Sequence, residues 1–363
     1  MRRLTRQNLE DILFGAVILG AGGGGDIREG MELVDHALAA GKHFDLVTLD
    51  EVPDDALICT PYMLGAITPM SADEERLYEG LPIAEGHPIL TAYDRFQAHL
   101  GREFHGTTAC ELGGSNTATA FFPAAMNGHV ILDADPAGRA VPEITHSTYY
   151  LAGLPAAPII AANAFGETFV LDGVKDDRRA ETLVRALSRV SRNDIAAIDH
   201  ALPMRTLRDA LIPGTITKAM HLGAVWRKTV RDNGPVAARV AEEGGGFVGF
   251  GGVVRAAEYR TEDGFTLGHL EIDGDGGTLR VDVKNENMAC HIDGEVFATI
   301  PDIITLFDTD TGAPLPNPDC HPGQQIAVVI LPAPAPFLTA QGLAIFGPRY
   351  AGIDAEYRPP QRR

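Results

Sequence analysis

The sequence contains few cysteines and no long apolar run. Its four cysteines lie far apart and form no C-x-x-C pair, so neither a disulfide framework nor a paired-cysteine metal site is indicated, and we expect free thiols. No apolar stretch reaches the roughly 18 residues that suggest a membrane span. The apolar run that follows the basic residues 1–6 is interrupted by Asn8, Glu10 and Asp11. We therefore expect a cytoplasmic protein without a signal peptide.

Basic residues are also scarce. Lys and Arg total 30 against 49 Asp and Glu, which gives a formal net charge of −19 at pH 7. Such a surface repels phosphate backbones and anionic lipid, so neither nucleic acid nor a membrane is an expected partner. The 363 residues are 45% hydrophobic, and single cores stop growing at roughly 250–300 residues. Two domains are therefore expected.

The periodicity of the sequence changes near residue 170. Before it, short β-like and helical segments alternate, which is typical of an α/β lobe. After it, residues 180–197 and 216–231 have the pattern of helices, and from residue 246 glycine-rich segments with period 2 dominate. We predict an α/β N-terminal lobe with a mixed sheet over residues 1–170. Residues 171–363 would form a β-rich α+β second lobe, with two helices leading into it.

A glycine-rich turn from Gly20 to Gly25 matches the pattern G-x-G-x-x-G. This pattern can hold a pyrophosphate against a helix N-terminus, so a nucleotide-binding oxidoreductase is one interpretation. The motif needs a strand before it, however, and the preceding residues have helical periodicity. A plain tight turn is a second interpretation. In a third, the N–H groups of Gly22, Gly23, Gly24 and Gly25 bind a small anionic substrate at the start of the next helix.

The richest polar stretch runs from Glu111 to Glu143. Asp133 and Asp135 follow the apolar run 130–132, which places them at the C-terminal end of a strand, where ligand crevices form in open α/β sheets. Carboxylates at i and i+2 share one face of a strand, so this pair is a candidate for acid–base catalysis or for binding a divalent metal ion. Turn formation before Pro136 is the structural alternative.

Other residues of this stretch offer further polar groups. Gly113, Gly114 and Asn116 precede a predicted helix and provide N–H donors and a side-chain amide, with helix capping as the alternative. Arg139 is a candidate clamp for a substrate carboxylate, or a partner for a neighbouring acid. Cys110 is a candidate nucleophile, although a lone cysteine in an apolar context is more often inert core.

The second lobe contributes one candidate segment. Lys284-Asn285-Glu286-Asn287 interrupts β-like sequence with polar residues. Either Asn285 and Glu286 enter the cleft between the lobes as substrate-binding residues, or the segment forms an exposed hairpin.

Over nearly its whole length the chain resembles the S-methyl thiohydantoin desulfurase family. The resemblance is carried by the glycine turn, by the segments Glu111–Asn116, Asp133–Glu143 and Asn285–Asn287, and by Gly347-Pro348-Arg349. The run D-x-D-x-x-G-R-x-x-P-E at Asp133–Glu143 is the most specific of these. Two places differ from the family pattern. Asp26-Ile27-Arg28 stands where a small or polar residue followed by Pro-Tyr is usual, and Val141 stands where an aromatic residue is usual.

The resemblance implies hydrolytic removal of sulfur from a five-membered cyclic substrate, an S-methyl thiohydantoin, to give a hydantoin and a thiol. Asp133 or Asp135 would activate water, directly or through a divalent metal ion, and Glu143 would handle the proton. Arg139 and the Gly113–Asn116 turn would orient the ring. Glu111 and Cys110 are further catalytic candidates.

Two expectations concern partners. The family is often encoded beside hydantoinase-type genes, so a non-catalytic accessory subunit of a hydantoinase-like enzyme is the alternative function. Two-lobed enzymes of this size often form symmetric oligomers, so we also expect a homo-oligomer.

Overall fold

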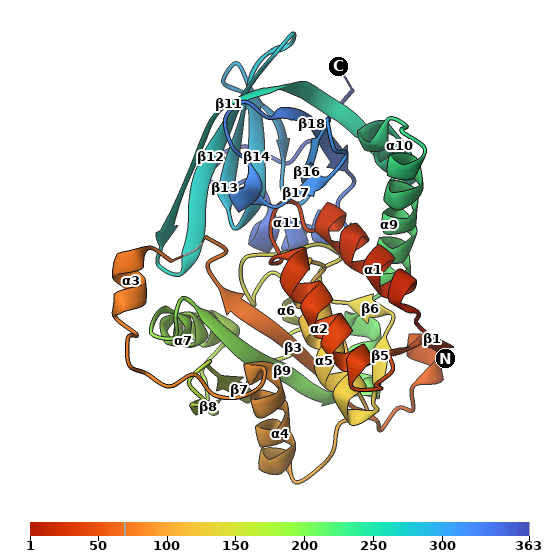
Figure 1. Ribbon diagram of the computed structural model, residues 1–363, viewed down its shortest axis with the longest axis vertical. Coiled ribbons are helices and arrows are strands. Elements are labelled where there is room, and N and C mark those ends of the chain that lie inside the picture. The colour runs from red at the N-terminus through yellow and green to blue at the C-terminus, as the bar shows by residue number, and fades with distance from the viewer. Residues whose placement is uncertain (69, 363) are drawn as a thin grey trace.

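The computed structural model describes residues 1–68 and 70–362, which form two large sheets with helices around the first (Figure 1). The helices are α1 (Arg6–Leu19), α2 (Ile27–Ala39), α3 (Ala72–Arg76), α4 (Pro88–Leu100), α5 (Asn116–Asn127), α6 (Thr148–Leu151), α7 (Asp177–Arg189), α8 (Met204–Leu207), α9 (Thr215–Arg231), α10 (Val236–Glu243) and α11 (Ala340–Phe346). None of these described helices is both long and apolar enough to span a membrane.

The first sheet is mixed. Its strands are β1 (Arg2–Arg3), β2 (Asp45–Val47), β3 (Leu57–Gly65), β4 (Gly106–Thr107), β5 (Val130–Leu132), β7 (Ile159–Ala162), β8 (Thr168–Leu171) and β9 (Asp194–Pro203). They lie in the order β1-β2-β5-β4-β3-β9-β7-β8. Neighbours from β2 to β3 are parallel, whereas β1 pairs with β2, β9 with both β3 and β7, and β7 with β8 in antiparallel fashion.

Helices cover both faces of this sheet, which explains why its central strands are apolar on both sides. On β3, Leu57 and Cys59 pack with the core formed by α1, α2, α4 and α5, whereas Tyr62 and Leu64 pack with α7 on the opposite face. Successive side chains of a strand point to opposite faces, so one strand supplies both cores. The result is a three-layer α/β/α lobe.

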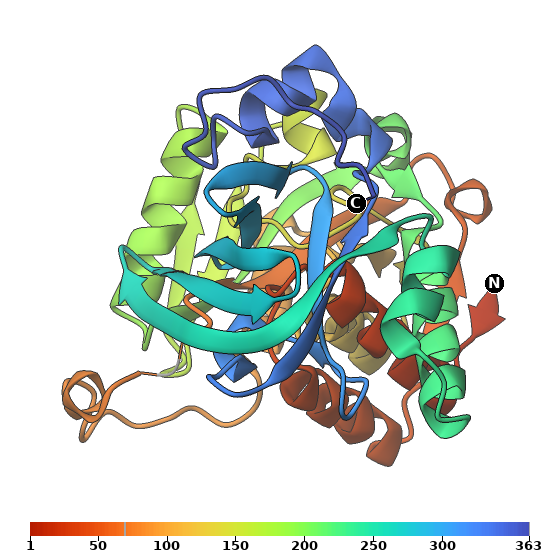
Figure 2. The ribbon, with the colours of Figure 1, turned by 90° about the horizontal axis from the view of Figure 1, so that it is seen from above.

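The second sheet is antiparallel throughout. Its strands are β11 (Phe247–Glu262), β12 (Phe265–Gly274), β13 (Gly277–Lys284), β14 (Glu286–Ile292), β15 (Glu295–Thr299), β16 (Ile303–Asp308), β17 (Pro314–Leu315) and β18 (Gln325–Leu331), in the order β15-β14-β13-β12-β11-β18-β16-β17. Alternate residues such as Leu270, Ile272, Val328 and Ile330 build its core, as the period-2 pattern predicts. Figure 2 shows β11 curving around this lobe. The predicted fold class is confirmed.

One predicted helix was too long. Residues 180–197 were expected to be helical, but α7 ends at Arg189, and β9 begins at Asp194. Arg192 and Asn193 adopt left-handed φ angles of 64° and 58° between them. Asparagine tolerates this conformation, and two such residues in succession end a helix. As a consequence β9 joins the first sheet, although it lies within the part of the chain, 171–363, expected to form the second lobe.

The glycine turn is preceded by a helix. α1 runs to Leu19 and is capped by Thr5, whose side chain accepts a hydrogen bond from the N–H of Asn8 while the Asn8 side chain accepts one from the N–H of Thr5. The dinucleotide motif requires a strand at this place. The structure therefore lacks the local context on which the nucleotide-binding interpretation depends.

Candidate functional site

A cavity of about 600 Å³ lies where the two lobes meet. The first lobe lines it with Thr60, Tyr62, Cys110, Glu111, Asn116, Glu143, Tyr149, Asp194, Asp199 and His200, and the second sheet with Asn285 and Glu286. Asn285 and Glu286 are thus buried and line the cavity, as one of the two alternatives for their segment expected, while their role in substrate binding stays a prediction. A cavity of this size, with several converging polar groups, is the expected form of a small-molecule site.

The glycine turn forms one wall of this cavity. Gly22, Gly24 and Gly25 line it, with φ angles of 88°, 79° and 81° that other residues rarely adopt. The carbonyl oxygen of Gly24 accepts hydrogen bonds of 3.1 Å from the N–H groups of Ser115 and Asn116. In contrast, the N–H groups of Gly24 and Gly25 donate to no acceptor within residues 1–68 and 70–362. Both residues line the cavity, so a ligand is the candidate acceptor for these N–H groups.

The other predicted glycines act through packing. A Cβ atom on Gly24 would lie 2.4 Å from Cα of Gly113, and one on Gly114 would lie 2.8 Å from the main-chain nitrogen of Ile27. Gly23 packs in the same way against the Glu286 side chain, because a Cβ atom on Gly23 would lie 2.1 Å from Oε1 of Glu286. Gly23, Gly113 and Gly114 do not line the cavity. They let two main chains approach closely enough to shape its wall.

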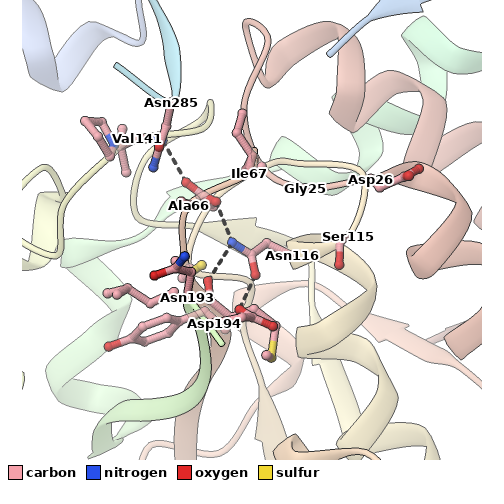
Figure 3. Close-up of a pocket in the computed structure, with 18 of the residues that line it drawn as sticks. Gly25, Asp26, Ala66, Ile67, Ser115, Asn116, Val141, Asn193, Asp194 and Asn285 are labelled. Atoms are coloured by element: carbon pink, nitrogen blue, oxygen red, sulfur yellow. Dashed lines mark hydrogen bonds between the residues drawn. The ribbon is translucent and has the colours of Figure 1, made fainter. Parts of the chain in front are cut away.

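Glu111 is held rigidly within the cavity wall by Asn116 and Val141, two residues labelled in Figure 3. Its Oε1 accepts from Nδ2 of Asn116 and its Oε2 from the N–H of Val141, both at 2.7 Å. Asn116 also exchanges hydrogen bonds with the main chain of Met63, at 2.8 and 3.1 Å. The Asn116 amide is thus committed to β3 and Glu111, so it positions Glu111 and leaves no free donor for a substrate.

The structure does not bring Asp133 and Asp135 to the cavity. Both carboxylate oxygens of Asp133 accept hydrogen bonds from Thr217, one from its N–H at 2.8 Å and one from its hydroxyl, so Asp133 anchors the first turn of α9. Asp135 accepts from the N–H groups of Ala137 and Gly138, at 3.0 and 2.7 Å. This is the turn-forming alternative at Pro136.

The same contacts bear on a metal site. The oxygens of Asp133 already have two donors, and no group of three or more His, Cys, Asp or Glu suited to a metal ion occurs within residues 1–68 and 70–362. The donor set around Asp133 and Asp135 therefore does not fit a divalent ion.

Arg139 is fully buried and does not line the cavity. It donates to the carbonyl oxygens of Ala140, Pro301 and Asp302 at 2.7–2.9 Å, which joins the loop after β6 (Ala134–Asp135) to the turn before β16. Its Nη2 has no partner among the described residues. The contacts of Arg139 are those of a structural residue, and they do not place it as a clamp on a substrate.

Glu143 lines the cavity in an ion pair. Nζ of Lys284 lies 2.7 Å from its Oε1, and the hydroxyl of Tyr350 donates to the same oxygen. Burial alone would raise the pKa of Glu143, but His146, Lys284 and Tyr350 together bring it below the ordinary value. Glu143 is therefore ionised and bonded, which makes it a poor proton donor.

Cys110 lines the cavity as a free thiol. Burial, followed by the charges of Glu111, Asp199 and Asp135, raises its pKa well above the ordinary value. A reactive cysteine needs a neighbouring cation or another group that stabilises the thiolate. The neighbours of Cys110 act in the opposite direction and keep it protonated.

Sequence reasoning missed a buried chain of side chains in the cavity. Tyr62 donates to Oδ2 of Asp199 at 3.0 Å, and Oδ1 of Asp199 lies 2.7 Å from Nδ1 of His200. Burial alone would lower the pKa of His200, but the interaction with Asp199 raises it overall. The Tyr149 ring covers the imidazole at a centroid distance of 4.2 Å. Tyr62 comes from β3, Asp199 and His200 come from β9, and Tyr149 comes from α6. The sequence did not reveal the pairing of β3 with β9.

Asp194 is the second missed residue. It lies at the start of β9, directly after the left-handed pair Arg192-Asn193. This turn is fixed because the Asn193 carbonyl accepts from the N–H of Ala66, at 3.1 Å. The Asp194 side chain is exposed in the cavity and forms no hydrogen bond or ion pair with another side chain of the described residues, although the adjacent N–H of Ile195 donates to it.

The environment of Asp194 favours its protonated form. The residue is exposed to solvent in the cavity, and the surrounding walls remove part of the hydration of its carboxyl. This desolvation, with repulsion from Glu29, raises its pKa to about 7. A free carboxyl with such a pKa suits proton transfer near neutral pH. The polar triplet Arg192-Asn193-Asp194, placed after a helix, was the available signal in the sequence.

Comparisons with known proteins agree with this architecture. Residues 7–173 match the family model "S-Me-THD-like, N-terminal domain", and residues 175–360 match "S-Me-THD-like, C-terminal domain". A search of curated proteins found no match. A crystal structure of a protein from Chromobacterium violaceum has the same fold, with a TM-score of 0.75 and 22% identity over 99% of this chain and 100% of that one. The two family models together cover nearly all of the sequence, and the chain therefore belongs to the S-methyl thiohydantoin desulfurase family.

Proposed function

We propose that this protein hydrolyses an S-methyl thiohydantoin to a hydantoin and methanethiol in the cavity between its lobes. Family membership supports the substrate class. The observation that carries the chemistry is Asp194, an unpaired cavity carboxyl with a pKa of about 7. Its ionised form can accept a proton from water near neutral pH.

The reaction needs an attack on one ring carbon. The carbon that bears sulfur is amidine-like and electrophilic, and Asp194 would remove a proton from the water that attacks it. A C–O bond forms and the C–S bond breaks. Methanethiolate then takes the proton held by Asp194 and leaves as methanethiol. Water is the nucleophile in this scheme because Cys110 is held as a thiol.

The glycine wall would orient the ring. The free N–H groups of Gly24 and Gly25 are suited to an acceptor atom. The carboxylates of Asp26 and Glu29 also line this wall, and they would repel an anion. A neutral ring carbonyl is therefore a better occupant than the anion expected from the sequence.

A thiol-release assay tests the proposed function. Purified protein is incubated with S-methyl thiohydantoins, and the thiol is trapped with a chromogenic reagent while the hydantoin is identified by mass. We expect both products in equal amounts. If thiol appears only after a co-purifying hydantoinase-like enzyme is added, the accessory-subunit function is correct and the proposal is wrong.

Replacing Cys110 with serine tests the choice of nucleophile. Because neighbouring carboxylates disfavour the thiolate, we expect Cys110→Ser to retain at least about a tenth of the wild-type kcat, whereas loss of a true nucleophile costs several orders of magnitude. Steady-state thiol release provides the measurement. A trapped Cys110 adduct in the wild type, with an inactive variant that is still folded, would establish covalent catalysis instead.

A further inference from the structure

The proposed hydrolysis requires a proton donor to the ring nitrogen. The cavity contains a buried carboxyl that forms no hydrogen bond with a neighbouring side chain in the described part of the chain. Glu286 lines the cavity at the start of β14 and is 2% exposed. Its Oε2 has no hydrogen-bond partner among the described residues. We propose that Glu286 is the general acid of the reaction and that the carboxylate of Glu111 keeps it protonated. This inference rests on the proposed function, for which it names a catalytic residue.

The position of Glu286 is set by the glycine turn. A Cβ atom on Gly23 would lie 2.1 Å from its Oε1, so only glycine leaves room for this carboxyl. The N–H of Asn287 donates to the Ala21 carbonyl at 2.8 Å, which ties β14 to the same turn. The carboxyl is therefore held beside the segment that offers the N–H groups of Gly24 and Gly25. Glu286 and these two glycines thus line the same part of the cavity.

The charged and titratable groups that face Glu286 are Glu111, Arg139, Arg185 and Tyr350. Burial raises the pKa of Glu111 to about 7, but the hydrogen bonds from Val141 and Asn116, both at 2.7 Å, oppose this shift. Glu286 has no such donors on Oε2 among the described residues, so Glu111 is the member of the acidic pair that ionises first. Burial, and then repulsion from Glu111, raises the pKa of Glu286 well above its ordinary value, although Arg139 and Arg185 oppose this shift. Glu286 is accordingly the protonated member.

Arg139 explains how Glu286 can release its proton. The guanidinium is fully buried, and its Nη2 has no partner among the described residues. When Glu286 becomes ionised, two carboxylates share one site, and a nearby cation offsets part of their repulsion. Arg139, which does not line the cavity, thus stabilises the negative charge that Glu286 carries after it has donated its proton.

The protons balance over one turnover. Glu286 donates to the ring nitrogen as water, deprotonated by Asp194, forms the C–O bond. When the C–S bond breaks, the thiolate takes the proton from Asp194. The hydroxyl left on the ring carbon returns its proton to Glu286 as the carbonyl forms. Water and the thioether are consumed, the hydantoin and methanethiol are released, and both carboxyls regain their starting states.

Glu286→Gln tests the proposal because glutamine keeps the shape but cannot donate an acidic proton. General acid catalysis contributes about 10²–10⁴-fold, so we expect kcat to fall at least about 100-fold while KM changes little. The pH profile separates this role from a structural one. Wild-type activity should fall at alkaline pH as Glu286 ionises, and the residual activity of the variant should lack that alkaline limb.

Glu111→Gln supplies an independent test. It removes the charge that raises the pKa of Glu286, so the alkaline limb should move to lower pH. The matched control is Glu75→Gln, which changes an exposed carboxyl that also lines the cavity and should leave both limbs in place. An unshifted alkaline limb in Glu111→Gln would overturn the proposal, as would a Glu286→Gln variant with normal rate and profile.

Infrared spectroscopy tests the protonation of Glu286 without turnover. A carbonyl band of protonated carboxyl should be present in the wild type at pH 7.5 and should lose the intensity of one carboxyl in Glu286→Gln. If this band is found but no thiol is released, the hydrolysis is wrong while the protonated Glu286 stands. If thiol is released and the band is unchanged in the variant, Glu286 is not the acid.

Discussion

Asp194→Asn should reduce thiol release by at least about 100-fold, because asparagine cannot accept the proton of the attacking water and general base catalysis contributes about 10²–10⁴-fold. The wild type should lose activity as the pH falls below about 7, where Asp194 becomes protonated. The residual activity of the variant should lack this acidic limb. The measurement is kcat/KM between pH 5 and 9.

The same substitution should stabilise the folded protein. The pKa of Asp194 is 3.8 in its ordinary state and about 7 in the fold. Between these values the folded state binds more protons than the unfolded state, so its stability falls as the pH rises. Asp194→Asn should therefore unfold at higher urea concentration than the wild type at pH 8, by roughly 1 kcal/mol after allowance for solvent in the cavity. The difference should shrink toward pH 4.

The combination of lower activity and higher stability separates a catalytic role from simple damage to the fold. Asp319→Asn is the control, since Asp319 lines the same cavity and its pKa is also raised by burial. It should keep activity within about threefold of the wild type, because general base catalysis is assigned to Asp194 alone. Equal loss of activity in both variants would show that the overall charge of the cavity matters and would remove Asp194 as the base.

Gly223→Ala should destabilise the protein by at least about 3 kcal/mol, the upper part of the usual range for overpacking. In most helices this change would add up to about 1 kcal/mol of stability. Here a Cβ atom on Gly223 would lie 1.8 Å from the carbonyl oxygen of Asp11 in α1. In the same way, a Cβ atom on Gly15 of α1 would lie 1.7 Å from the carbonyl oxygen of Ala219 in α9.

Forcing these two helices apart would disturb further contacts. Phe14 stacks on Trp226 at a centroid distance of 3.8 Å, and Arg227 holds both oxygens of Asp11 at 2.7 and 3.0 Å. Urea unfolding gives the free energy of unfolding. His221→Ala changes an exposed side chain two residues away on the same helix, and should alter the stability by no more than about 0.5 kcal/mol. A similar small effect for Gly223→Ala would show that α1 and α9 can separate freely.

The candidate site could be predicted in part. Asn285 and Glu286 were singled out because polar residues interrupt a β-like segment, but the sequence left an exposed hairpin as an equal alternative to the cleft. The wall at Gly22, Gly24 and Gly25 was recognised because consecutive glycines indicate close approach of main chains. Asp199 and His200 were not, because their partner Tyr62 lies in β3, more than 130 residues away.

The sequence by itself determined most of the local elements, the fold class and the family. Helical and strand periodicities, the glycine turn and the run from Asp133 to Glu143 are all written in short stretches of chain. The tertiary structure decided which carboxyls face the cavity. Thr217 of α9 occupies both oxygens of Asp133, and the left-handed pair before β9 delivers Asp194 unpaired. Whether a carboxyl accepts hydrogen bonds or stays free for a ligand depends on which residues pack against it. Those residues come from distant parts of the chain.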